Sequence, residues 1–214
     1  ESDKKAVIVV TANRGLAGGY NSNITRMIID EGFTKENTVV YAVGKKGREL
    51  LERKGYEIKA DYSEAINDPI YKDAKEICDD VLSAFADGEV GEIYLAYTVF
   101  KNTVVHEPQL IRLLPVEADD AAHETDGSEA LMTYEPSEEE ALDMIIPKYV
   151  CSLVYGALIE SVASENGARM QAMDSATSNA EEMISTLSLK YNRARQASIT
   201  QELTEIIAGA NAIE

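Results

Sequence analysis

The feature that most limits the fold of this chain is a long C-terminal stretch without helix-breaking residues. From Lys148 to Ile213 the sequence contains no proline, and at 1.5 Å per residue these 66 residues would form a helix roughly 100 Å long. Apolar residues recur there in steps of three and four in two runs, Met173, Ala176, Ala180, Met183 and Leu187, and then Ile199, Leu203, Ile206, Ala210 and Ile213. This spacing is typical of a coiled-coil seam. Because no single small domain can bury such a helix, we expect its seam to contact another helix.

The first hundred residues alternate between strand and helix signals. Short β-rich runs at 6–12, 38–43 and 93–100 predict strands, with 109–116 as a candidate for a further one, and helices are expected at 22–33, 45–54 and 69–86. In the last of these, Asp68 is the expected cap, Pro69 occupies the first turn and Gly88 ends the helix. The alternation predicts a Rossmann-like α/β sandwich around a parallel or mixed sheet, followed by the very long coiled-coil helix.

Charge and composition divide the chain into three parts. Residues 1–116 form the predicted α/β domain, 117–136 an acidic excursion, and 137–214 the long helix, with a kink or restart near Pro147 because proline removes a donor and clashes with the preceding turn. Ten acidic residues and no basic residue occur between 117 and 140, so we expect this segment to be solvated and mobile, with at most a short ladder at 130–134.

Net charge excludes one class of partner. The formal charge of −18 argues against binding to nucleic acid, whose phosphates require an excess of basic residues. The charge is uneven, with 15 basic and 30 acidic residues up to position 147 but 5 and 8 from there on. A helix closer to neutral enters a protein cavity at a lower desolvation cost.

No segment is predicted to insert into a membrane. The run without charges at 149–159 has 11 residues, well below the roughly 20 that span a bilayer. Lys4 and Lys5 precede an apolar run, but it ends at Asn13 and Arg14 without a cleavage site, so we interpret the run as a buried strand and not as a signal peptide.

The two cysteines, Cys78 and Cys151, are 73 positions apart. Each falls on the apolar face of a predicted helix, and their spacing matches no metal motif. We interpret them as buried free thiols of a protein from a reducing compartment.

A glycine-rich loop follows the first predicted strand, where a doubly wound fold would bind a phosphate. Its glycines, Gly15, Gly18 and Gly19, fit neither the dinucleotide fingerprint nor a P-loop, and no Lys-Ser or Lys-Thr pair follows them. We therefore expect a structural turn that packs against the foot of the long helix, with no cofactor bound.

Two further groups suggest chemistry only weakly. Asp119, Asp120, His123 and Glu124 would lie close together in a local helix, but the stretch lacks the apolar support that fixes metal ligands, and a solvated acidic loop explains it. His106 has no identifiable serine or cysteine partner, so a nucleophilic triad is unsupported. We predict neither a metal site nor a catalytic residue.

A dense set of polar residues surrounds the second apolar run of the long helix. It comprises Arg193, Arg195, Gln196, Thr200, Gln201 and Glu202. From the residues alone, a solvated helix surface explains this set, whereas a surface that binds a partner explains why donors and acceptors of fixed geometry gather at one end of the chain.

Three ordered blocks of this sequence resemble a known family. They read VVTANRGLAGGYNSNI, ENGARMQAMDSATSNAEEMI and YNRARQASITQELTEI, and together they extend over nearly the whole chain. All three are similar to signature segments of the gamma subunit of the rotary (F-type) ATP synthase. By this resemblance, the family's N-terminal helix should precede residue 1, and we expect this chain to lack it.

The resemblance also implies a role for the site residues. In that family the residues matching Arg195 and Gln196 bond to a loop of one beta subunit, and Thr200, Glu202 and Arg193 lie in the same contact region. It further implies a non-catalytic central-stalk rotor without cofactors, whose partners are the alpha and beta subunits, the epsilon subunit and the membrane c-ring. Such a subunit is peripheral to the cytoplasmic face of a bacterial membrane.

Two other interpretations of the residues stay open at this point. One is a small nucleotide-binding α/β enzyme with a coiled-coil dimerisation tail, which binding of ATP or NAD would reveal. The other is a cytoskeletal or chaperone-like coiled-coil adaptor, which would not co-purify with alpha and beta subunits.

Overall fold

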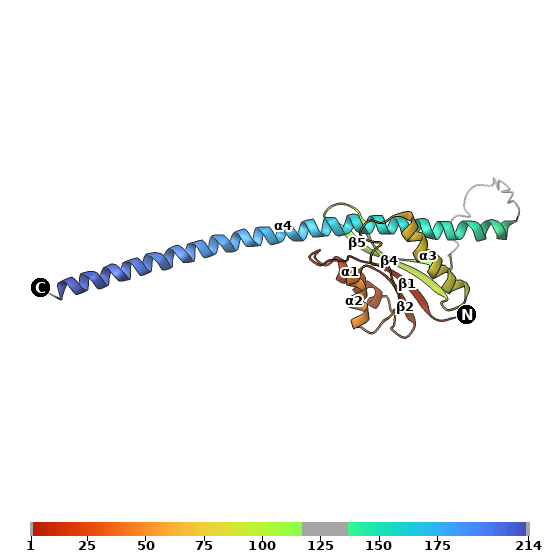
Figure 1. The fold of residues 1–214 in the computed structure, drawn as a ribbon, viewed down its shortest axis with the longest axis horizontal. Helices are drawn as coiled ribbons and strands as arrows, with labels where there is room; N and C mark the ends of the chain where they lie inside the picture. Colours follow the sequence, from red (N-terminus) through yellow and green to blue (C-terminus); the bar gives the residue numbers. More distant parts are fainter. Residues whose placement is uncertain (1, 117–136, 213–214) are drawn as a thin grey trace, which may run out of the picture. The chain divides into compact units, whose positions relative to one another are not determined.

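A computed structural model describes residues 2–116 and 137–212 of the chain (Figure 1). Its elements in chain order are β1 (Lys5–Val10), α1 (Tyr20–Asp30), β2 (Thr38–Val43), α2 (Lys45–Arg53), β3 (Glu57–Asp61), α3 (Tyr71–Ala86), β4 (Glu92–Phe100), β5 (His106–Leu114) and α4 (Glu138–Asn211). The chain divides into two compact units, Glu1–Gln171 and Ala172–Glu214, with the boundary inside α4.

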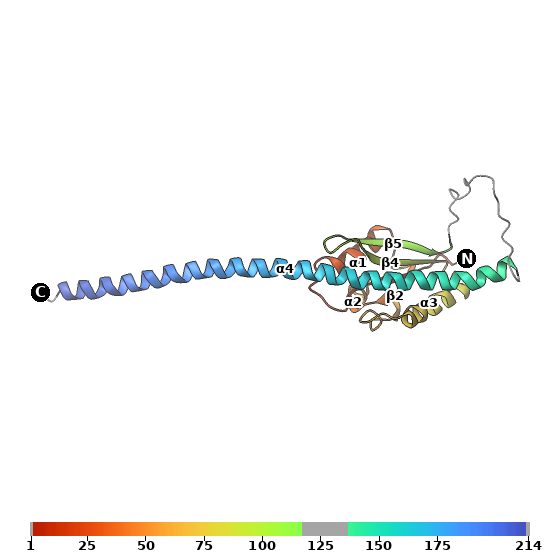
Figure 2. The same cartoon turned by 90° about the horizontal axis from the view of Figure 1, so that it is seen from above.

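The first unit is built on a mixed five-stranded sheet with the order β3-β2-β1-β4-β5. The contacts of β1 with β2 and β4, and of β2 with β3, are parallel, whereas β5 runs antiparallel to β4. Helices cover both faces of the sheet, with α1 and α2 on one side and α3 and the first part of α4 on the other (Figures 1 and 2). This arrangement confirms the predicted α/β sandwich followed by a long C-terminal helix.

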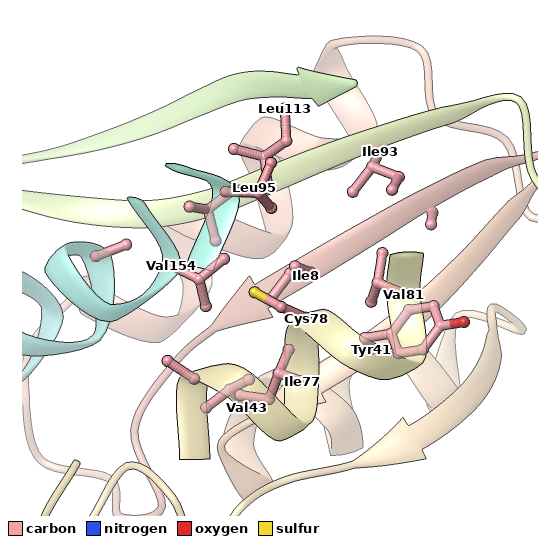
Figure 3. Close-up of a cluster of buried hydrophobic side chains, with 14 of the residues drawn as sticks. Ile8, Tyr41, Val43, Ile77, Cys78, Val81, Ile93, Leu95, Leu113 and Val154 are labelled. Carbon is pink, nitrogen blue, oxygen red and sulfur yellow. The ribbon is translucent and has the colours of Figure 1, made fainter. Parts of the chain in front are cut away.

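Alternate residues of the central strands enter the two layers of the core. Ile8 and Tyr41 point toward α3 and α4, where they pack with Cys78, Val81 and Val154 (Figure 3). On the opposite face, residues of β1 and β2 pack against α1 and α2, chiefly Val7, Val9, Val40, Ile24, Ile28 and Leu51. Since both faces are covered, β1 and β2 are apolar after their first residues, Lys5 and Thr38, and show no alternation in the sequence.

Most predicted elements are present with shifted ends. The strands expected at 38–43 and 93–100 correspond to β2 and β4, and the candidate strand at 109–116 is β5, which begins earlier, at His106. Strand β3 was not predicted. Its five residues alternate between exposed and half-buried positions at the edge of the sheet, so they lack the apolar run that marks the central strands.

The expected start of α3 was wrong. Asp68 does not cap this helix, because Ile70 adopts an extended backbone (φ −114°, ψ 160°) and the helix begins at Tyr71. The carboxylate of Asp73 instead accepts a hydrogen bond from the Ile70 backbone N–H at 3.2 Å. The expected end is confirmed: Gly88 has φ 71° and donates its N–H to the Phe85 carbonyl.

The helix does not restart at Pro147. α4 continues through this residue over 74 residues. Proline leaves the carbonyl four residues earlier without its helical donor. Because Asp143 and its neighbours Met144 and Ile145 are exposed, water can hydrogen-bond that carbonyl.

By length and composition alone, α4 also contains a stretch that would suit a bilayer, with a mean hydropathy of 1.5. A core helix of a water-soluble protein meets the same test, and 28% of this stretch is buried inside the protein. Buried α4 residues such as Val150, Val154 and Leu158 belong to the core on the sheet.

The prediction of buried free thiols is confirmed. Cys78 on α3 is 2% exposed and Cys151 on α4 is 4% exposed, and neither forms a disulfide. The two thiols interact with each other in the core, and burial raises the pKa of the Cys78 thiol. A thiol held protonated is a poor nucleophile.

The predicted acidic excursion at 117–136, its short ladder, and the group formed by Asp119, Asp120, His123 and Glu124 lie outside the described residues. Over 2–116 and 137–212, no three His, Cys, Asp or Glu side chains gather closely enough to hold a metal ion.

Gly44 offers a direct test of the packing between β1 and α2. It has φ +119°, and a Cβ built there would lie 2.0 Å from the Thr11 carbonyl oxygen. We expect Gly44→Ala to lower the free energy of unfolding by about 2–4 kcal/mol, because it combines backbone strain with a clash against main chain. Denaturant unfolding of the chain measures the change.

Gly156→Ala is the matched control, since nothing lies within 4 Å of its Cβ position on α4. It should leave stability unchanged or raise it by up to about 1 kcal/mol, because alanine favours helix. Equal effects of the two substitutions would contradict the described approach of Thr11.

The two thiols give a second test of the core. In the folded chain, Cys78 and Cys151 should react far more slowly with an aromatic disulfide reagent than a free thiol does, because the reagent cannot reach them and Cys78 stays protonated. Absorbance should show both thiols released only in denaturant. Rapid labelling of either one before unfolding would show that α3 and α4 separate in solution.

Candidate functional site

The second unit consists of the C-terminal half of α4. Every described residue from Met173 to Ala212 is exposed. Among these are large apolar side chains that would be costly to leave in water, including Met183, Ile184, Leu187, Leu189, Tyr191, Ile199, Leu203, Ile206 and Ile207, with exposed fractions between 46% and 67%. Uncovered apolar surface of this extent is typical of a site for a protein partner.

The two apolar runs lie on different sides of α4. The 12 residues from Leu187 to Ile199 turn a regular helix by three full turns and about a further 120°. A partner that covers both runs must therefore wind around α4, or two partners must cover one run each.

The predicted contact residues border the second run. By helical geometry, Arg195 and Glu202 lie on one side of the line through Ile199 and Ile206, and Gln196 lies on the other side. Thr200 and Arg193 lie on the same side as Gln196, farther around the helix axis from that line. All five predicted residues are exposed on α4. The apolar run is thus flanked by side chains that can donate and accept hydrogen bonds.

Some polar groups of this region are already bonded within the helix. The Thr200 hydroxyl donates to the Gln196 carbonyl at 2.8 Å, and the Gln201 amide donates to the Glu205 carboxylate at 2.9 Å. In contrast, the side chains of Arg195 and Gln196 have no hydrogen-bond or ion-pair partner among the described residues. Arg195 and Gln196 are therefore available to a partner, whereas Gln201 is engaged.

The glycine loop between β1 and α1 packs against α4. The Arg169 guanidinium donates to the Gly15 carbonyl at 3.4 Å and pairs with Glu165 at 2.7 Å. Gly18 has φ +56°, which glycine adopts without strain, and Gly19 precedes the first residue of α1. The loop is thus a turn that contacts the helix through Gly15.

The place where a doubly wound fold binds ligands is occupied by α4 itself. That place is the carboxyl edge of the sheet between β1 and β4, where the strand order reverses. The Tyr20 hydroxyl donates to the Ser161 carbonyl there at 3.0 Å. Ala12, Ala17 and Tyr20 form a small buried cluster with Ala168 of α4.

A hollow of about 600 Å³ lies at the opposite, amino edge of the parallel strands. Lys5 and Glu92, at the starts of β1 and β4, line it and pair at 2.9 Å. Their hydrogen bond raises the pKa of Lys5 and lowers that of Glu92, so both stay charged at neutral pH. Lys5 and Glu92 therefore neutralise each other in the lining of this hollow.

Sequence reasoning missed the polar residues that join α4 to the sheet. Ser161 and Ser164 are fully buried on α4, and both bond to the backbone of Thr98 on β4. The available signal was their position: Ser161 continues the apolar spacing of Val154 and Leu158, so a polar residue occurs where the pattern requires a buried one. His106 lies near the same helix, with its Nε2 atom 2.4 Å from the Cβ position of Gly167.

Comparison with known proteins places the chain in a family. The family model described as ATP synthase matches residues 1–213. The ATP synthase gamma chain of Lachnoclostridium phytofermentans is 67% identical over 219 aligned residues, covering 100% of this chain and 75% of that protein. The "ATP synthase gamma chain, sodium ion specific" of Acetobacterium woodii is 43% identical and covers 100% and 76%.

Solved structures with the same fold agree. A chain of the Euglena gracilis mitochondrial ATP synthase superimposes with a TM-score of 0.73 at 19% identity, over 99% of this chain and 73% of that chain. A chain from the central stalk and c-ring structure of the Tetrahymena thermophila enzyme gives a TM-score of 0.63 at 24% identity, over 83% and 78%. These structures share the fold, and the whole-chain family match and the bacterial relatives show that the chain belongs to the ATP synthase gamma chain family.

Proposed function

We propose that this chain is the rotating central-stalk subunit of an ATP synthase and is not itself catalytic. In this role it couples rotation driven by protons or sodium ions to the conformational cycle of the catalytic beta subunits. The observation that carries the proposal is the exposed second half of α4, with its bare apolar runs and unpaired polar side chains, in a member of the gamma chain family.

The mechanism rests on differential contact. A single asymmetric helix cannot present the same side to three beta subunits at once, so each subunit is held in a different conformation. Turning the helix exchanges these contacts in sequence. Work is transferred because the helix binds the alternative states of one subunit with different affinity.

The proposed beta-subunit contacts are the residues that flank the second apolar run, Arg193, Arg195, Gln196, Thr200 and Glu202. Arg195 suits this role because its planar guanidinium stays charged and binds a carboxylate through two parallel hydrogen bonds. The bonded Thr200 hydroxyl keeps two acceptor lone pairs for a partner.

The two exposed apolar runs of α4 must be covered by a partner. We propose that the helix preceding residue 1 in the gamma family winds around α4 as a coiled coil, and that the alpha and beta subunits surround the pair. A winding partner accounts for the rotation of about 120° between the two runs.

The α/β unit is proposed to contact the epsilon subunit and the membrane c-ring, with Gly15, Gly18 and Gly19 forming a structural turn. The protein then lies peripherally at the cytoplasmic face of a bacterial membrane, without inserting into it. Its net charge of −18 leaves no role for nucleic acid.

The proposal that the chain is not catalytic predicts that it binds no nucleotide. The crevice between β1 and β4 is filled by Tyr20 and α4, and the glycine loop lacks a lysine to hold phosphate. Calorimetric titration with ATP, ADP and NAD should give no binding. A stoichiometric dissociation constant below about 10 µM, far tighter than a filled crevice permits, would instead support a nucleotide-binding enzyme.

The contact role predicts a loss of coupling without a loss of fold. In the assembled complex, Arg195→Ala or Gln196→Ala should lower ATP synthesis roughly tenfold, because a charge-assisted hydrogen bond to the beta subunit is lost. The melting temperature of the isolated chain should not change, since both side chains are exposed.

Lys190→Ala is the matched control for these variants. Lys190 is exposed on the same helix, about 140° around the axis from Arg195, so its loss removes a charge of the same sign on a different side of the helix from Arg195. If Lys190→Ala impairs synthesis as much as Arg195→Ala, or if Arg195→Ala melts earlier in isolation, the contact assignment is wrong.

A further inference from the structure

Strand β4 extends beyond its parallel neighbour β1. The last paired residues of the two strands are Val9 and Ala96, whereas β4 continues to Phe100. On its other side, Thr98 lies opposite Pro108 of β5, but the Thr98 N–H and carbonyl both point away from β5, toward α4. Thr98 is 3% exposed. Its backbone groups therefore need partners that neither water nor β1 supplies.

Helix α4 supplies these partners through two serines. The Ser161 hydroxyl oxygen accepts a hydrogen bond from the Thr98 N–H at 3.4 Å, and the Ser164 hydroxyl donates to the Thr98 carbonyl at 3.1 Å. Both serines are fully buried. Because they are three positions apart, they share one side of the helix and hold both polar groups of one strand residue.

Tyr20 completes this group from α1. It is 5% exposed, and its hydroxyl donates to the Ser161 carbonyl at 3.0 Å. Burial raises the pKa of the Tyr20 phenol, so it remains a donor at neutral pH. We call Tyr20, Thr98, Ser161 and Ser164 the serine junction, since α1, β4 and α4 meet there through directional hydrogen bonds.

The rest of the contact between α4 and the sheet is apolar. Val150, Cys151, Val154 and Leu158 pack into the core without a hydrogen bond to a strand residue in the described structure. Apolar burial opposes separation of helix and sheet, but it has no preferred direction. Hydrogen bonds weaken steeply when their angle changes. Burial of one apolar side of α4 sets its approximate rotation about its axis, and the serine junction adds a directional constraint to it.

We propose that the serine junction is the torque-bearing lock between the α/β domain and α4, an inference that rests on the proposed rotor function. Its residues act as positioning residues. They keep α4 in one rotational register when the domain and the far half of the helix experience opposing forces. Without the junction the apolar contact would remain, and α4 would turn or slide on the sheet under load.

The test uses ATP synthase that holds the full-length gamma chain, reconstituted in vesicles. ATP hydrolysis is measured with an ionophore present, so that no load opposes rotation, and ATP-driven ion transport is measured against an increasing ion gradient. The variants are Ser161→Ala with Ser164→Ala, and separately Tyr20→Phe, which keeps the buried ring. Ser152→Ala is the matched control, because this exposed α4 serine, among the described residues, bonds only to the carbonyl of Lys148 in its own helix.

We expect unloaded hydrolysis of the junction variants to stay within about twofold of the unchanged enzyme. Transport at the highest gradient should fall by roughly 2- to 10-fold for each lost hydrogen bond, the change in an equilibrium constant that one net hydrogen bond supplies. Ser152→Ala should change neither. A role in folding alone would lower the amount of assembled enzyme, and so reduce both activities by the same factor.

The inference is overturned if the junction variants lose ion transport under load and unloaded ATP hydrolysis by the same factor. It is also overturned if, like Ser152→Ala, they change neither activity. If the double variant does not assemble, Tyr20→Phe decides by the same ratio of activities. Arg195→Ala is measured in parallel. If Arg195→Ala impairs transport and the junction variants do not, the junction is not a lock, but the rotor proposal stands. If none of these variants impairs transport, the rotor proposal fails as well.

Discussion

The burial of one side of α4 on the parallel sheet is the constraint on which the rest of the structure depends. Val154 and Leu158 belong to the same core as Ile8 of β1, so α4 covers the part of this face of the sheet that α3 does not cover. The helix has 74 residues, far more than the domain can bury. What remains is an exposed helix that continues a buried one, and its exposed apolar residues need a partner to cover them.

The sequence predicted the parts of the fold that depend on local pattern. The apolar runs of β1 and β2 and the spacing of α3 predict buried strands and an amphipathic helix without reference to other segments. β3 was missed because a strand at the edge of a sheet can contain few apolar residues. The start of α3 was misplaced because Asp73, and not Asp68, bonds to the backbone at the start of the helix. A restart of the helix at Pro147 was wrong, because the lost hydrogen bond falls on the exposed side of the helix, whereas a kink there stays a prediction.

The candidate site likewise has a part that the sequence predicted and a part that it could not predict. The exposure of Arg195 and Gln196 follows from a helix too long to be buried, whereas their contact with a beta subunit remains a prediction based on resemblance. The serine junction could not be predicted, because its significance lies in a pairing between residues more than 60 positions apart. A serine within a predicted helix does not by itself indicate a contact with the sheet, because its partner on the strand is not known from the pattern. The occupied crevice further shows why a Rossmann-like sheet does not imply a nucleotide site.

The edges of the sheet have a consequence for a protein that moves past stationary neighbours. β5 is an outer strand, and such strands readily recruit further strands from other chains. Pro108 interrupts the donors along β5, and Glu107 beside it carries a charge paired with Lys101. With a proline in place of one donor and a paired charge beside it, this edge offers little to a further strand, so the sheet resists extension by a strand of a neighbouring chain.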